Sequence, residues 1–142
     1  MRSHDQVIWD FTQGWLRMAE LDYGVAETLL ERRGEYTEAV AFHSQQAAEK
    51  FVKTLLVRHQ IEFPKTHDLS MLRGLLAKTD SVLAAQLAFA DWLTPFGVEV
   101  RYPSQTPELP DDVGDRALSA ARKVRESVMA ALDAYLSKGR PI

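Results

Sequence analysis

The sequence predicts an all-α protein, an antiparallel up-and-down four-helix bundle with an additional short helix. Apolar residues recur at helical spacing along most of the chain, and short segments rich in Gly or Pro separate the periodic stretches. The only strand-like run, residues 98–102, is too short to support a sheet. A length of 142 residues with 46% hydrophobic residues suits one domain with one core, so we expect a single domain over residues 1–142.

The first predicted helix covers residues 7–30, where the apolar positions keep a helical period. It ends at Arg32-Arg33-Gly34, because basic residues followed by Gly are typical of a helix C-terminus. The second begins near Tyr36 or Thr37, and its period continues to about residue 60. These two segments are the longest continuous helical patterns in the first half of the chain.

Two further helices are predicted before the proline-rich segment. Thr66 is a candidate N-cap for a short helix ending near residue 76. A fourth helix opens at Asp80 or Ser81, continues through residue 93 and is closed by Pro95 and Gly97. Short connections between successive helices favour antiparallel packing, with the third helix as a lateral addition.

The last helix follows the one long loop of the sequence. Three prolines fall between residues 103 and 110, and no period continues through residues 97–110. Asp111 and Asp112 then stand where carboxylates favour a helix start, and the final apolar period ends before Gly139. Binding residues concentrate on loops carried by a rigid scaffold, so we expect candidate binding residues within residues 97–110.

The composition excludes several classes of function. With 17 Lys and Arg against 20 Asp and Glu, the net charge of −3 does not suit a protein that coats nucleic acid everywhere, so nucleic-acid contacts should be local. The absence of Cys excludes disulfides and thiol chemistry and fits the cytoplasm. No apolar run approaches the roughly 20 residues that span a membrane. Without a Gly-rich phosphate loop, a paired-His zinc helix or a Gly-flanked nucleophilic Ser, we expect no metal and no cofactor.

The second helix carries the first candidate site. On a helical wheel, its polar residues His43, Gln46, Lys50 and Lys53 lie within an arc of roughly 80°, opposite the apolar half. This stripe is either a cationic surface that holds a phosphate or a base edge, or an ordinary solvated helix face. Ser44 falls inside the apolar half, where we expect it to bond back to the carbonyl one turn earlier.

Gln45 lies at the edge of the apolar half of the same helix. A covered amide needs partners, so we expect an internal hydrogen bond between helices.

The long loop carries the second candidate site, Arg101-Tyr102-Pro103. Arg offers a planar set of donors to phosphate, and the Tyr ring can stack on a base. Alternatively, Arg101 pairs with Asp91 or Glu99, and Tyr102 covers the end of the bundle. His67 is a third candidate, because a helix start places free backbone N–H groups beside an anion, although capping or simple exposure also explains it.

Three short signatures make the chain similar to the HEPN family of small helical proteins. They are Phe42-His43-Ser44-Gln45-Gln46-Ala47-Ala48-Glu49-Lys50, Thr66-His67-Asp68-Leu69 and Arg101-Tyr102-Pro103. The resemblance spans nearly the whole chain. It implies a helical bundle with a role in nucleotide and RNA biology, a groove lined by the second helix, and a functional Arg101.

The chain departs from the HEPN ribonucleases in one respect. These enzymes carry an Arg followed by four to six residues and then a His. Here no His follows Arg101, and no other Arg has a His at that spacing. Loss of the group that transfers the proton lowers the rate of cleavage by a factor of about 10² to 10⁴. We therefore expect no catalytic residue in this position and little activity of the protein alone.

Three hypotheses follow from the resemblance. In the first, the protein binds a nucleotide or RNA and acts with a partner such as a minimal nucleotidyltransferase in a toxin–antitoxin-like pair. In the second, it is a ribonuclease toxin that uses a displaced His, with His43 and His67 as candidates. In the third, it is a structural, oligomerising helical module.

A homodimer is expected as well. The aromatic residues Trp9, Trp15, Trp92, Phe11 and Phe96 exceed what one small core readily covers.

Overall fold

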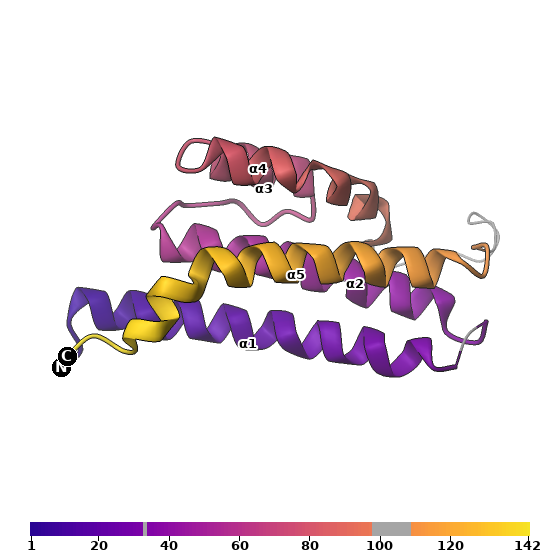
Figure 1. Cartoon of the computed structure of the whole chain (residues 1–142), viewed down its shortest axis with the longest axis horizontal. Helices are drawn as coiled ribbons and strands as arrows, with labels where there is room; N and C mark the ends of the chain where they lie inside the picture. The colour runs from indigo at the N-terminus through magenta and orange to yellow at the C-terminus, as the bar shows by residue number, and fades with distance from the viewer. Residues whose placement is uncertain (33, 98–108) are drawn as a thin grey trace.

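The computed structural model describes residues 1–32, 34–97 and 109–142. In these residues the chain forms five α-helices and one 3-10 helix, labelled in Figure 1 where there is room. The three long helices are α1 (His4–Leu30), α2 (Thr37–Arg58) and α5 (Val113–Lys138). The short ones are α3 (Leu69–Leu76), α4 (Ser81–Gln86) and the 3-10 helix η1 (Ala88–Gly97). The all-α class predicted from the sequence is confirmed.

The bundle is built around α2, which packs against α1, α5, α3 and η1. Following the colours of Figure 1, α1 runs in one direction, α2 returns, α4 and η1 run back, and α5 returns again. The up-and-down bundle therefore has α4 and η1 together as its third limb, and α3 is the additional short helix. Buried apolar side chains of α2, among them Phe51, Leu55 and Leu56, fill the centre. Each contributes about 1.5–3 kcal/mol through removal from water.

Local signals explain most helix ends. Ser3 and Gln6 form a capping box at the start of α1, since the Ser3 side chain accepts from the Gln6 N–H while the Gln6 side chain bonds the Ser3 N–H. Gly34 and Gly139, beyond the ends of α1 and α5, have φ values of 85° and 75°, the left-handed region that suits Gly. The Asp80 side chain accepts a hydrogen bond from the Leu83 N–H at the start of α4.

Two local predictions were wrong. The N-cap of α3 is Asp68, whose side chain accepts from the Met71 N–H, and Thr66 instead accepts from the Asp68 N–H. The fourth predicted helix does not continue as one α-helix but changes to 3-10 geometry after Gln86. Its last segment contains Pro95, which cannot donate a hydrogen bond within a helix. The predicted loop falls largely on residues 98–108, outside the described residues, together with Arg101 and Tyr102.

The chain ends meet at one end of the bundle (Figure 1). Arg140 donates to both carboxylate oxygens of Asp10, and the Gln6 side chain donates to the carbonyl of Pro141. The last residues, Arg140 and Pro141, are therefore held against α1. No helix in the described part of the chain is long and apolar enough to cross a membrane.

Candidate functional site

The polar residues of α2 form one continuous band along the helix. We call the six residues His43, Gln45, Gln46, Glu49, Lys50 and Lys53 the polar band. α1 contacts the band on one side, and the connection from α2 to α3 contacts it on the other. Two carboxylates that the sequence analysis did not single out, Asp22 and Glu49, organise the band into two clusters.

The first cluster joins α1 to α2 through Asp22. One carboxylate oxygen of Asp22 lies 2.8 Å from Nδ1 of His43, and the other accepts a hydrogen bond from Nζ of Lys50 at 2.5 Å. The side chains of Asp22 and Lys50 are mostly covered, whereas the His43 side chain is 34% exposed. The positive charge of Lys50 is thus balanced by a carboxylate from the neighbouring helix.

The second cluster is centred on Glu49, which is 2% exposed. Its carboxylate accepts hydrogen bonds from Lys53 Nζ at 2.9 Å and Gln45 Nε2 at 3.2 Å, and it lies 2.7 Å from Nδ1 of His67. A buried charge is tolerated when it is paired and fully hydrogen-bonded. The three partners meet that requirement for Glu49.

Lys53 is more enclosed than its position on the helical wheel indicates. It is 7% exposed, and its Nζ also donates to the carbonyl of Thr66. The rings of Trp15 and Phe63 stand 5.5 and 5.4 Å from this Nζ, at distances where a cation attracts an aromatic face. The interpretation of Lys53 as part of a solvated face is wrong, because α1 and the connection after α2 cover it.

Gln45 links the band to the connection before α3 and to η1. Its Nε2 donates to the carbonyl of His67 at 3.1 Å, and its Oε1 accepts from Gln46 Nε2 at 2.7 Å. The internal hydrogen bonding predicted for Gln45 is confirmed, but its partners lie on α2 itself and in the connection before α3, and not on another helix. Gly97 packs so closely on Gln45 that a Cβ atom on Gly97 would stand 2.6 Å from the amide carbon.

The position of Gly97 bears on Arg101, four residues later in the chain. η1 therefore ends beside the polar band, and the chain between Gly97 and Arg101 spans at most about 14 Å when fully extended. Asp91, the alternative partner considered for Arg101, has both carboxylate oxygens bonded by Arg73.

Ser44 does not make the expected bond to the preceding turn. Its Oγ is buried and has no hydrogen-bond partner among the described residues. The wheel placed Ser44 inside the core correctly, but its hydroxyl makes no hydrogen bond with any described residue.

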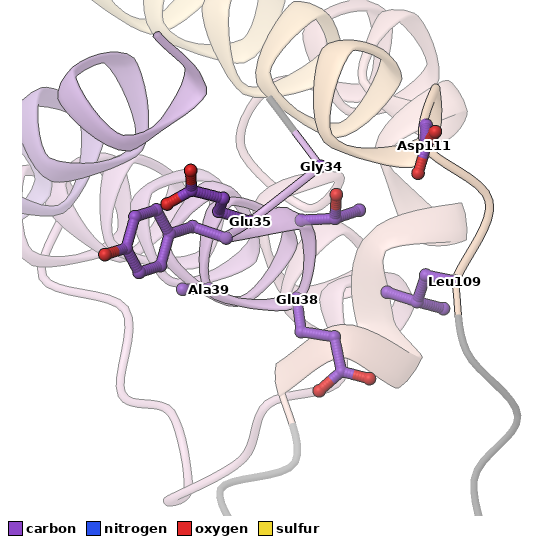
Figure 2. Close-up of a pocket in the computed structure, with 8 residues that line it drawn as sticks. Gly34, Glu35, Glu38, Ala39, Leu109 and Asp111 are labelled. Carbon is purple, nitrogen blue, oxygen red and sulfur yellow. The ribbon is translucent and has the colours of Figure 1, made fainter. Parts of the chain in front are cut away.

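A separate pocket lies at the start of α2 (Figure 2). It has a volume of about 510 Å³, and its described wall includes Glu35, Glu38 and Asp111 but no Lys or Arg. Three carboxylates disfavour a phosphate. Among the described residues, no group of three or more His, Asp or Glu side chains is placed to hold a metal ion. The polar band is therefore the better candidate for recognition of a nucleotide or RNA.

The fold and the band together define a small helical bundle whose central helix carries paired polar groups, some buried and some partly exposed. The HEPN domain model matches residues 12–131, so the chain belongs to the HEPN family. Membership associates it with nucleotide- and RNA-related functions. No curated protein and no solved structure gives a significant match to the chain.

Proposed function

We propose that this HEPN protein binds a nucleotide or RNA at the polar band and acts with a partner protein, such as a minimal nucleotidyltransferase in a toxin–antitoxin-like pair. The main support is the arrangement of His43 and His67. Each imidazole contacts a carboxylate through Nδ1, and each remains partly exposed. A carboxylate that holds Nδ1 fixes the orientation of the ring and leaves Nε2 for a ligand.

The stripe predicted on α2 is less cationic than its sequence indicates. Lys50 and Lys53 are each paired with a carboxylate, so they contribute little net charge. Recognition then depends on hydrogen bonds from Gln46 and the two histidines, with Arg101 and Tyr102 as the proposed contribution of the loop after Gly97. Binding should be weak, and it should weaken further as salt rises.

Titration calorimetry with a nucleotide panel and a short RNA tests the proposal. Arg101→Ala should reduce the affinity because it removes a donor, and Lys50→Ala should reduce it because it leaves the Asp22 carboxylate without its lysine beside the site. Circular dichroism should show unchanged helical content in both variants. Lys138→Ala, at the exposed end of α5, is the matched control and should bind like the wild type. Binding unaffected by the first two substitutions would place the site elsewhere. Co-purification with the product of a neighbouring nucleotidyltransferase gene tests the partner.

The second candidate function is a ribonuclease that uses a displaced His. It is favoured by His67, because a carboxylate-bound imidazole with an exposed Nε2 can transfer a proton. We expect the purified chain to cleave RNA poorly or not at all, since the Arg-x4-6-His motif is absent. RNA cleavage that disappears in both Arg101→Ala and His67→Gln would favour the ribonuclease instead.

We also propose a homodimer, with a surface that differs from the aromatic one expected. The three tryptophans have intramolecular partners, since Trp9 packs on Tyr135, Trp15 on Phe63 and Trp92 on Phe96. Four exposed apolar side chains follow one another along α1, where Phe11, one of the expected aromatics, and Met18, Leu21 and Val25 are 39–64% exposed. A protein that forms this homodimer but binds no nucleotide or RNA would fit the third hypothesis, a structural, oligomerising helical module.

A further inference from the structure

The imidazole of His67 connects a buried charge to the solvent. Its Nδ1 lies 2.7 Å from Oε1 of Glu49; the Glu49 side chain is 3% exposed and that of His67 is 50% exposed. The remaining nitrogen, Nε2, has no hydrogen-bond partner among the described residues. It is therefore the atom of this cluster that a ligand can reach.

The contact with Glu49 determines which nitrogen carries the hydrogen. Lys53 and Gln45 also donate to this carboxylate, so both of its oxygens already act as acceptors. An ionised carboxylate only accepts hydrogen bonds, so Nδ1 must carry a hydrogen. In the neutral ring, Nε2 then has a lone pair and no hydrogen. It becomes a donor only when the ring takes up a second proton and is cationic.

The groups around His67 leave room for one additional positive charge. From α2, the charged groups are Glu49 and Lys53, which balance each other at 2.9 Å. α1 contributes the ring of Trp15 over Lys53, and η1 contributes the Thr94 hydroxyl, which accepts from the Leu69 N–H. The neighbouring Asp68 caps α3 through its side chain. Glu49, Lys53 and a neutral His67 together have no net charge, and protonation of His67 gives these three side chains one positive charge, next to the separate carboxylate of Asp68.

We propose that His67 binds a phosphate group of the ligand and that this binding takes up one proton. The proton comes from solvent and is added to Nε2, whose N–H then donates to a phosphate oxygen while the Nδ1 hydrogen remains on Glu49. The proposal rests on the proposed RNA or nucleotide binding and specifies the ligand group as an anionic phosphate. A ribose hydroxyl that donated to the neutral Nε2 would bind without proton uptake, which separates the two contacts experimentally.

Titration calorimetry with a short RNA that lacks terminal phosphates is the test, because phosphodiesters do not titrate near neutral pH. The heat of binding at pH 7.5 is measured in two buffers that differ in ionisation enthalpy. Binding by the wild-type protein should take up protons, so the heat should differ between the two buffers and the affinity should fall as the pH rises. This measurement requires no variant.

The variants locate the proton. His67→Gln should bind with lower affinity and take up no proton. His59→Gln is a matched control, since His59 follows the end of α2 without a carboxylate contact among the described residues, and it should retain the uptake. Uptake that persists in His67→Gln, or disappears in His59→Gln, would overturn the assignment.

The outcomes distinguish this inference from the proposed function. RNA binding with the same heat in both buffers would leave the proposed function standing and overturn the phosphate contact at His67. No binding at any pH between 6 and 8 would overturn both.

Discussion

Gly97 lies directly against Gln45, so that a Cβ atom at position 97 would overlap the amide group at 2.6 Å. Gln45 is fully buried and is held by hydrogen bonds to the His67 carbonyl and to Glu49. The end of η1, the centre of α2 and the connection before α3 therefore meet at one point. Because Gln45 is held by its neighbours, a small change at Gly97 should displace side chains of the polar band.

Gly97→Ala should destabilise the protein by about 1–3 kcal/mol, because the added methyl group overpacks a site whose neighbour cannot move freely. Gly24→Ala is the matched control. A Cβ atom at Gly24, in the middle of α1, meets nothing within 4 Å, so this change should stabilise by about 0.5–1 kcal/mol. Urea unfolding of both variants measures the difference. Equal effects would show that Gln45 adapts to the methyl group.

Glu49→Gln should cost about 3–5 kcal/mol, because it leaves the charge of Lys53 buried without its partner. The exposed pair Arg32 and Glu35, at 62% and 56% side-chain exposure, provides the comparison, and Glu35→Gln should change stability by less than about 1 kcal/mol. Replacing both Glu49 and Lys53 by Leu should recover much of the loss. If the double variant is as unstable as Glu49→Gln, the network has a structural role beyond charge balance.

Ser44→Ala should leave the protein equally stable or raise its stability by up to roughly 1 kcal/mol, because the buried hydroxyl has no partner among the described residues. Thr54→Val, on the same helix, removes a hydrogen bond of 2.7 Å from Oγ1 to the Lys50 carbonyl and should be the more destabilising of the two. Thermal unfolding ranks them. Marked destabilisation by Ser44→Ala would indicate that its hydroxyl has a bonding partner after all.

The pH dependence of stability should include a contribution from Asp10. Hydrogen bonds from Arg140 and Arg2 lower the pKa of Asp10 from 3.8 to about 2. Between these values the unfolded chain binds more protons than the folded one, so the contribution is present above pH 3.8 and is lost as the pH falls toward 2.

Asp10→Asn should remove this contribution, whereas Asp133→Asn, at an exposed position without an ion pair among the described residues, should not. Unfolding curves at pH 5 and pH 3 measure the change. An NMR titration that gives Asp10 an ordinary pKa would contradict the interpretation.

The homodimer should form through the exposed face of α1. Sedimentation equilibrium at micromolar concentration should give twice the monomer mass of 16.1 kDa. Leu21→Glu should shift the protein to monomer, because it places a charge within the apolar face. Val82 on α4 is equally exposed, at 67% against 64% for Leu21, so Val82→Glu is the control and should remain dimeric. A wild-type monomer would exclude the dimer.

The apolar period, with Gly, Pro and capping residues at the ends, predicted where the three long helices lie. A helix repeats every 3.6 residues whatever it packs against, so the spans of α1, α2 and α5 follow from local sequence with ends displaced by a few residues. The break between α4 and η1 was not predicted, because the apolar period continues through residue 93 without change. Backbone geometry there depends on how the segment fits against α2 and α3.

The candidate site was predicted only in part. The wheel of α2 grouped His43, Gln46, Lys50 and Lys53, and the position of His67 at a predicted helix start, within one of the HEPN signatures, made it a candidate. The wheel did not reveal that Asp22 pairs with Lys50, 28 residues away, or that Glu49 holds His67 from 18 residues away. Helical spacing describes neighbours within one helix, whereas these contacts depend on which faces of separate elements meet. Local sequence therefore determined the helices and the family, whereas the tertiary structure decided which charges are balanced and which imidazole nitrogen contacts a carboxylate.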